Sequence, residues 1–153
     1  MPPVVSASVT AEAHRGYWRA MSRENVEIMR RFHDTFNRRD VEGFLALMHP
    51  DIEVVPITGR LEGTVYRGHA EVRAFLGDFD KDWEIFKTVP VEFRDFGDCV
   101  MSLGTWESRG RKSGIDLNAQ PGAWVAWVRD GKITRQETFT NRAHALEAVG
   151  LGE

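Results

Sequence analysis

The 153-residue chain has little of what several classes of protein require. Its single cysteine, Cys99, cannot form an internal disulfide, which favours a reducing, cytoplasmic location. The net charge of −3 provides no basic field for nucleic acid, and no apolar run approaches the roughly 20 residues of a membrane span. No group of His, Cys, Asp or Glu has the spacing of metal ligands. We therefore expect no nucleic-acid or membrane partner, no metal and no cofactor.

What remains is an ordinary globular composition, with 42% hydrophobic and 28% charged residues. The length fits one domain with its own core. Residues 1–20 contain two prolines and many small residues without apolar periodicity, and we expect them to form a poorly ordered tail. Residues 21–153 are expected to form the single domain, and Met21 is an alternative start of the chain.

Hydrophobic periodicity predicts an α+β architecture. Apolar residues at intervals of three and four predict helices, and alternating or continuous apolar runs predict strands. The predicted helices cover residues 22–36, 40–48, 69–86 and 142–149, and the predicted strands cover 51–57, 91–96, 99–109, 115–128 and 133–140. Asp40 is expected to cap the second helix, and Pro90 to mark the exit from the third. Because helices precede a run of consecutive strands, we expect helices on one face of a curved antiparallel sheet.

The stretch "AWVAWVRDGKITRQETF", residues 123–139, predicts a β-hairpin with a two-residue Asp130-Gly131 turn. That turn pairs Arg129 with Lys132. Strict alternation then places seven residues on one face, namely Trp124, Ala126, Val128, Ile133, Arg135, Glu137 and Phe139. The other face carries Ala123, Val125, Trp127, Thr134, Gln136, Thr138 and Thr140.

Three segments, "VEIMRRFHDTFNRRDVEGFLALMHPDIEV", "YRGHAEVRAFLGDF" and "VRDGKITRQETFTNRAHALEAVGL", resemble the SnoaL-like family of the nuclear transport factor 2-like superfamily. The resemblance implies a cone-shaped fold, in which a bent antiparallel sheet wraps around N-terminal helices and encloses an apolar pocket. Members include polyketide cyclases, limonene epoxide hydrolases and ketosteroid isomerases. Because the fold carries several activities, the residues of the site must decide the function.

At the catalytic positions of these relatives, the chain carries residues that cannot transfer a proton. The resemblance places the tyrosine and the base of ketosteroid isomerases at Phe32 and Val55, and their acidic donor near Val125. It places the last-strand aspartate of limonene epoxide hydrolases at Thr138, and the acid–base pair of polyketide cyclases at Gln136 and Thr138. The usual catalytic carboxylates are therefore expected to be absent.

The resemblance also assigns roles to the hairpin faces. The pocket is expected to be lined by Phe32, Val55, Phe79, Trp83, Val125, Gln136, Thr138 and Thr140. The convex face would expose an apolar patch in a monomer, so a homodimer interface is expected there. Its residues are Trp124, Val128, Ile133, Arg135, Glu137 and Phe139.

Three functions remain open. The chain could bind a small hydrophobic molecule of polyketide, steroid or terpenoid type in the pocket. It could be an isomerase, a cyclase or an epoxide hydrolase-like enzyme that uses noncanonical residues, for which Glu53, Glu107 and His33 are candidates. It could also be a noncatalytic dimeric interaction module. Each of the three candidates has a simpler interpretation, as a solvated strand residue or as a hydrogen-bonded histidine beside the core.

Overall fold

The computed structural model describes residues 23–57 and 62–150. The predicted tail therefore lies outside the described residues. The helices are a segment that includes residues 23–37, α2 (Val41–Ala46), α4 (Gly68–Asp82) and α5 (Arg142–Ala148). The strands are β1 (Met48–Val55), β2 (Tyr66–Arg67), β3 (Trp83–Asp95), β4 (Cys99–Gly110), β5 (Asp116–Arg129) and β6 (Lys132–Phe139). Asp40 caps α2 as predicted, since its Oδ1 accepts a hydrogen bond from the Gly43 amide at 3.0 Å.

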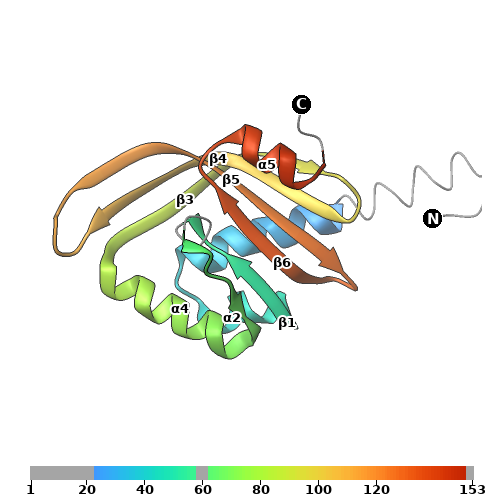
Figure 1. Ribbon diagram of the computed structural model, residues 1–153, viewed down its shortest axis with the longest axis horizontal. Helices are drawn as coiled ribbons and strands as arrows, with labels where there is room; N and C mark the ends of the chain where they lie inside the picture. The colour runs from blue at the N-terminus through green and yellow to red at the C-terminus, as the bar shows by residue number, and fades with distance from the viewer. Residues whose placement is uncertain (1–22, 58–61, 151–153) are drawn as a thin grey trace, which may run out of the picture.

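The strands form one six-stranded curved sheet in the order β2-β1-β6-β5-β4-β3 (Figure 1). The N-terminal helix, α2 and α4 lie against its concave face, and α5 packs on the opposite, convex face. This arrangement confirms the predicted α+β fold. The sheet differs from the expectation in one respect, because β1 pairs with β6 in parallel while the other pairs are antiparallel.

The third helix ends earlier than predicted. It stops at Asp82, and Trp83 already has extended dihedral angles, with φ −120° and ψ 124°. Trp83 and Phe86 therefore belong to strand β3, where a register shift after Trp83 lets both side chains face the same cavity. Pro90 lies within β3 rather than marking a boundary. It is tolerated because β3 is an edge strand, which leaves one side of its backbone unpaired.

The last hairpin begins as predicted and then changes parity. Asp130 and Gly131 have φ values of 54° and 75°, and Arg129 pairs with Lys132, as a two-residue turn of this kind requires. Beyond Val128 and Ile133, however, β6 contains an extra residue, Thr134. This β-bulge shifts every later pair by one residue, so Trp124 lies opposite Thr138 rather than opposite Glu137.

Because of the bulge, the residues of the predicted interface do not share one face of the sheet. Trp124, Val128 and Ile133 belong to the core between the concave face and the helices. Arg135, Glu137 and Phe139 lie on the convex face, as their pairing with β1 and β5 shows. Phe139 is only 1% exposed, because it packs in a second core with Val125 and Ala145 of α5. The apolar patch predicted from strict alternation is therefore absent from the outer face.

Cys99 lies in this second core and is 2% exposed. Burial raises the pKa of its thiol to about 12, and the neighbouring carboxylates of Asp98 and Asp95 act in the same direction. The thiol is therefore protonated at neutral pH and behaves as a small hydrophobic group. The cytoplasmic location inferred from this lone cysteine stays a prediction. Over the described ranges, every helix is too short or too polar to cross a membrane.

A glycine substitution tests the close approach of β3 and β4, and a second one in α4 serves as its control. A Cβ added at Gly104 would lie 2.1 Å from the Val89 carbonyl oxygen, so Gly104→Ala has to push the two strands apart. We expect the free energy of unfolding in urea to fall by about 1–3 kcal/mol. Gly77 lies on the exposed face of α4 with no atom within 4 Å of an added Cβ, and Gly77→Ala should raise it by roughly 0.5–1 kcal/mol. Changes of the same sign in both variants would contradict this account.

Candidate functional site

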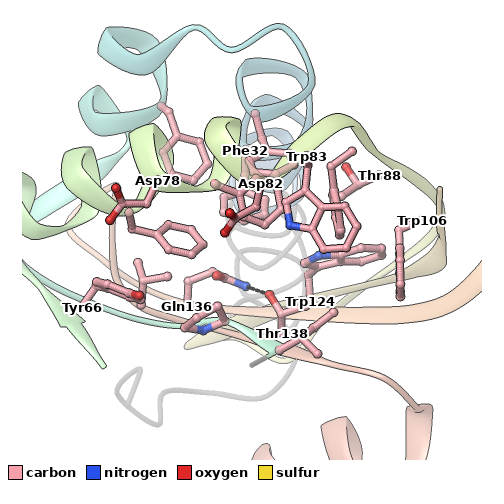
Figure 2. A pocket seen from close by; sticks show the side chains of 18 residues that line it. Phe32, Tyr66, Asp78, Asp82, Trp83, Thr88, Trp106, Trp124, Gln136 and Thr138 are labelled. Carbon is pink, nitrogen blue, oxygen red and sulfur yellow. Dashed lines mark hydrogen bonds between the residues drawn. The ribbon is translucent and has the colours of Figure 1, made fainter. Parts of the chain in front are cut away.

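A cavity of about 550 Å³ lies between the concave face of the sheet, the N-terminal helix and α4 (Figure 2). Small-molecule sites commonly have volumes of roughly 300–1,000 Å³. Most of the lining is aromatic, and the rings include Phe36, Phe79, Trp83, Phe86, Trp106 and Trp124. The cavity therefore has the size and the apolar surface expected of a site for a hydrophobic molecule.

The rings contact one another and form a continuous wall. Phe86 and Trp106 are stacked, with centroids 5.1 Å apart and planes only 9° from parallel. Phe79 and Trp83 pack on Phe86 with centroid distances of 4.7 and 5.5 Å. Such contacts hold each ring in place, because neighbouring rings leave little room for another rotamer. The wall therefore presents a preformed aromatic surface.

Gly122 makes the close approach of two indoles possible. A Cβ added there would lie 2.6 Å from Cη2 of Trp124 and 3.0 Å from Cδ1 of Trp106, and both indoles line the cavity. Real side chains do not tolerate a contact of 2.6 Å, so a larger residue would displace the Trp124 ring. The two indoles can therefore line the cavity in this arrangement only because residue 122 is a glycine.

Gln136 and Thr138 of β6 form the polar floor of the cavity (Figure 2). They are 2% and 9% exposed, and Nε2 of Gln136 donates to Oγ1 of Thr138 at 3.1 Å. This bond fixes the amide so that its oxygen is turned to the cavity interior. Among the described residues, no side chain donates a hydrogen bond to that oxygen. The floor therefore offers a buried acceptor to a ligand.

Asp78 and Asp82 form the acidic mouth of the cavity. They lie one turn apart on α4, are exposed to solvent and line the cavity. Figure 2 shows the Asp82 carboxylate above Gln136. In the described part of the chain, no Lys, Arg or His side chain lines the cavity. This pair is absent from the predicted site, although its spacing from Phe75 and Phe79 places both aspartates on the same helix face.

His33 lies behind the cavity and not in its lining. Its Nδ1 is 2.8 Å from Oγ1 of Thr88, and its Nε2 is 2.7 Å from Oγ of Ser102. Because the Thr88 hydroxyl donates to Oδ1 of Asn37, it accepts from Nδ1–H, and Nε2 accepts from Ser102. Burial lowers the pKa of His33 to about 3. His33 is thus a neutral, hydrogen-bonded residue outside the cavity lining, and this position does not support its candidate catalytic role.

Glu53 and Glu107 also lie outside the cavity lining. Since Val54 faces the cavity, its neighbour Glu53 faces the convex side, where Oε1 lies 2.6 Å from Nη1 of Arg135. Arg135 also donates from Nε to Oε2 of Glu137 at 2.8 Å. These contacts join the convex-face residues within one chain. Glu53 and Glu107 are therefore ruled out as pocket carboxylates in this arrangement.

The structure brings together only part of the predicted pocket. Phe32, Phe79, Trp83, Gln136 and Thr138 line the cavity. Val55 and Val125 do not, because each lies one residue from a strand position that faces it. Their neighbours Val54 and Trp124 line the cavity instead, and neither can transfer a proton. Thr140 lies beyond the end of β6 and outside the lining.

Potential metal ligands are not gathered anywhere in the described ranges, where no group of three or more His, Cys, Asp and Glu side chains could hold an ion. The buried aromatic lining is a poor environment for a hard cation, which prefers several oxygen ligands. The chemistry of the site is therefore that of its rings, its polar floor and its acidic mouth.

The chain matches one family model and is similar to several solved structures. A family model described as the SnoaL-like domain matches residues 29–136. TerC, co-crystallized with polyporic acid, is 30% identical, with 83% of this chain and 98% of that chain covered and a TM-score of 0.69. An NTF2-like protein of unknown function from Burkholderia pseudomallei is 24% identical over 81% and 95% of the two chains, with a TM-score of 0.70. A SnoaL-like, polyketide cyclase-like protein from Jannaschia is 18% identical over 83% and 89%, with a TM-score of 0.67. No curated protein matches the chain.

The buried histidine predicts a pH dependence of stability. The folded protein holds the pKa of His33 at about 3, below the ordinary value of 6.5. As the pH falls below 6.5, the unfolded chain binds a proton that the folded chain excludes, so stability present above pH 6.5 is lost progressively towards pH 3. The free energy of unfolding should fall by about 1.4 kcal/mol per pH unit, or about 2 kcal/mol between pH 6.5 and 5. Urea unfolding at these pH values measures it.

The variant His33→Gln provides the control, because glutamine keeps a donor and an acceptor but does not titrate. Its free energy of unfolding should change much less between pH 6.5 and 5, whatever its stability at neutral pH. Equal slopes for the wild type and the variant would show that the burial of His33 does not control this pH dependence.

Proposed function

Because the chain belongs to the SnoaL-like domain family, we propose that it binds a small hydrophobic molecule in the concave cavity. The observation that carries the proposal is the cavity of about 550 Å³ with a wall of contacting rings and a buried polar floor. Preformed apolar sites with a few placed polar groups are typical of small-molecule binding. The aromatic wall favours a hydrophobic, polycyclic ligand, such as a polyketide-, steroid- or terpenoid-like compound.

Binding without acid–base chemistry is the version of this proposal that the residues support best. The cavity-facing residues Phe32, Val54 and Trp124 cannot exchange protons at neutral pH. An isomerase, cyclase or epoxide hydrolase reaction would have to use Asp78, Asp82 or the hydroxyl of Tyr66, which line the cavity. The two aspartates lie at the exposed mouth, where water competes for the proton. The scaffold alternative predicts a filled interior, and a cavity of this volume argues against it.

Binding can be tested with TerC's co-crystallized compound, polyporic acid, and with uncharged polycyclic aromatic molecules as probes. Trp106→Ala removes a ring that lines the cavity and stacks on Phe86. We expect it to raise the Kd of an aromatic probe by about tenfold in calorimetry, because one ring contact and its buried area are lost.

Trp127→Ala is the matched control, because Trp127 packs against the convex core and is not part of the cavity lining. Its Kd should stay within about twofold of wild type if the ligand occupies the cavity. Native mass spectrometry of the protein purified from its own host gives an independent test, since a copurified hydrophobic ligand would identify the chemistry. Failure of every aromatic probe to bind wild type, or equal losses in both variants, would reject the proposal.

We also propose that the chain forms a homodimer through its convex face. The apolar surface that supports this proposal is smaller than the patch expected from the sequence. Trp127, Leu146 and Val149 remain only partly buried there, beside the ion pairs of Arg135. A two-fold contact would bury these groups on both subunits at once.

Sedimentation at low micromolar concentration should give a dimer for wild type and a monomer for Arg135→Glu, which places like charges beside Glu53 and Glu137. Arg38→Glu makes the same charge change on the N-terminal helix and should leave the dimer intact. Phe139→Glu is not a fair test, because Phe139 is already buried within one chain. A wild-type monomer would overturn the proposal.

A further inference from the structure

The charged side chains and the one amide in the described cavity lining share one electrostatic character. The charged side chains in the described lining are Asp78 and Asp82, and both are acidic. The buried amide of Gln136 turns its oxygen, a hydrogen-bond acceptor, to the interior (Figure 2). A ligand that complements these groups carries positive charge near the mouth and a hydrogen-bond donor near the floor.

We propose that the acidic mouth is a subsite for a cationic amino group, so that the ligand is an aromatic or polycyclic amine rather than an organic acid. This inference rests on the proposed function, because it names the class of molecule that the same cavity binds. The geometry of α4, the amide of Gln136 and the charges around the mouth each support it.

The geometry of α4 places carboxylates and ring faces side by side. Asp78 and Asp82 lie four residues apart, and Phe75, Phe79 and Trp83 line the cavity from the same stretch of chain. An ammonium group at this point contacts carboxylate oxygens and aromatic faces together. Aromatic faces attract cations because the ring carries negative charge on its face. A carboxylate ligand would meet repulsion from the same rings and the same aspartates.

The floor gives a second, independent reason. Gln136 is 2% exposed, and its Nε2 is committed to Thr138 at 3.1 Å. Turning the amide over, so that its nitrogen replaced the oxygen at the cavity interior, would break that bond. A ligand that lacked a donor at this depth would leave the Gln136 oxygen without a hydrogen bond in an apolar site, which is unfavourable. An acid that entered carboxylate first would place two acceptors against each other.

Neighbouring cations do not neutralise the mouth completely. Nζ of Lys81 lies 3.5 Å from Asp78, but both side chains are at least three-quarters exposed, and such pairs are weak. Arg39 is held by Asp80, with Nε 2.8 Å from Oδ1, and Asp80 is not part of the cavity lining. Within the described residues Asp82 has no ion pair. The Asp82 carboxylate is therefore available to a bound cation.

The test uses three probes that share one bicyclic ring and differ in charge, namely 2-naphthylmethylammonium, 2-naphthol and 2-naphthoate. At pH 7 and low salt, wild type should bind the ammonium probe about tenfold or more tightly than the carboxylate probe. The preference should shrink as salt is added, because the mouth is exposed to solvent. Calorimetry or competition against a fluorescent aromatic probe measures the three Kd values.

Two double variants assign the preference to the mouth. Asp78→Asn/Asp82→Asn should reduce the preference for the ammonium over the carboxylate probe to about twofold or less, while the Kd of 2-naphthol stays near its wild-type value. Asp34→Asn/Asp130→Asn removes the same net charge from exposed positions outside the cavity lining and should keep the preference. Circular dichroism and melting temperature confirm that each variant is folded.

The outcomes separate this inference from the function on which it rests. If 2-naphthol and both charged probes fail to bind wild type, the proposed function fails and the inference fails with it. If 2-naphthol binds but the carboxylate probe binds as tightly as the ammonium probe, the inference alone is overturned. A preference that persists in the Asp78/Asp82 double variant would overturn the assignment of the subsite to these residues.

Discussion

The extra residue at Thr134 determines which side chains of the last hairpin reach the cavity. The turn fixes the pair Val128–Ile133, and Ile133 is buried in the concave core. A regular ladder beyond that pair would point Arg135 and Glu137 into the same core. Placing an ion pair in an apolar interior is costly, because attraction seldom compensates the loss of hydration. The bulge reverses the parity at that point, so Arg135 and Glu137 turn outward, where Arg135 pairs with both Glu137 and Glu53.

The same shift creates the polar floor. Once Arg135 and Glu137 face outward, Gln136 and Thr138 face inward and line the cavity. Their mutual hydrogen bond satisfies part of their polar capacity and orients the rest. Trp124 lies opposite Thr138 and extends the aromatic wall across the sheet. One local irregularity in β6 therefore separates the ion pairs of the convex face from the ligand-facing groups of the concave face.

Behind the wall, His33 connects three elements without entering the cavity. Its two ring nitrogens bond Thr88 of β3 and Ser102 of β4, and its ring lies edge-on to Trp124 with centroids 4.8 Å apart. A neutral imidazole satisfies both hydroxyls because it offers one donor and one acceptor. The N-terminal helix is thereby fixed to the strands that carry the rings, which keeps the shape of the cavity defined.

The sequence predicted the elements whose signals are local. The Asp130-Gly131 turn, the Asp40 cap and the order of helices and strands are set by residue type and periodicity. The end of α4 was placed incorrectly, because Trp83 and Phe86 continue the helical spacing of the preceding apolar residues, although they pair in a strand. The sequence around Thr134 contains no local signal for a bulge. The bulge follows from the burial of Ile133 and the charges of the residues after it, and these constraints combine only in the folded sheet.

The acidic mouth was missed for a related reason. Charged residues on one side of an amphipathic helix usually face water, and Asp78 and Asp82 are indeed exposed. Only the curvature of the sheet and the early end of α4 bring that side of the helix to the opening of a cavity. Of the predicted pocket residues, Val55 and Val125 failed with the parity of β1 and β5, whereas residues on helices, such as Phe32 and Phe79, were placed correctly.

The orientation of the polar groups also bears on the chemistry that the cavity could support. Isomerisation through an enolate, as the resemblance to ketosteroid isomerases would suggest, requires hydrogen-bond donors directed at a developing oxyanion. In this cavity the Gln136 amide donates to Thr138 and turns its oxygen inward, while two carboxylates of α4 lie at the entrance. Negative charge developing between them would be destabilised, and positive charge would be stabilised. The charges at the entrance therefore favour a bound cation over a developing enolate.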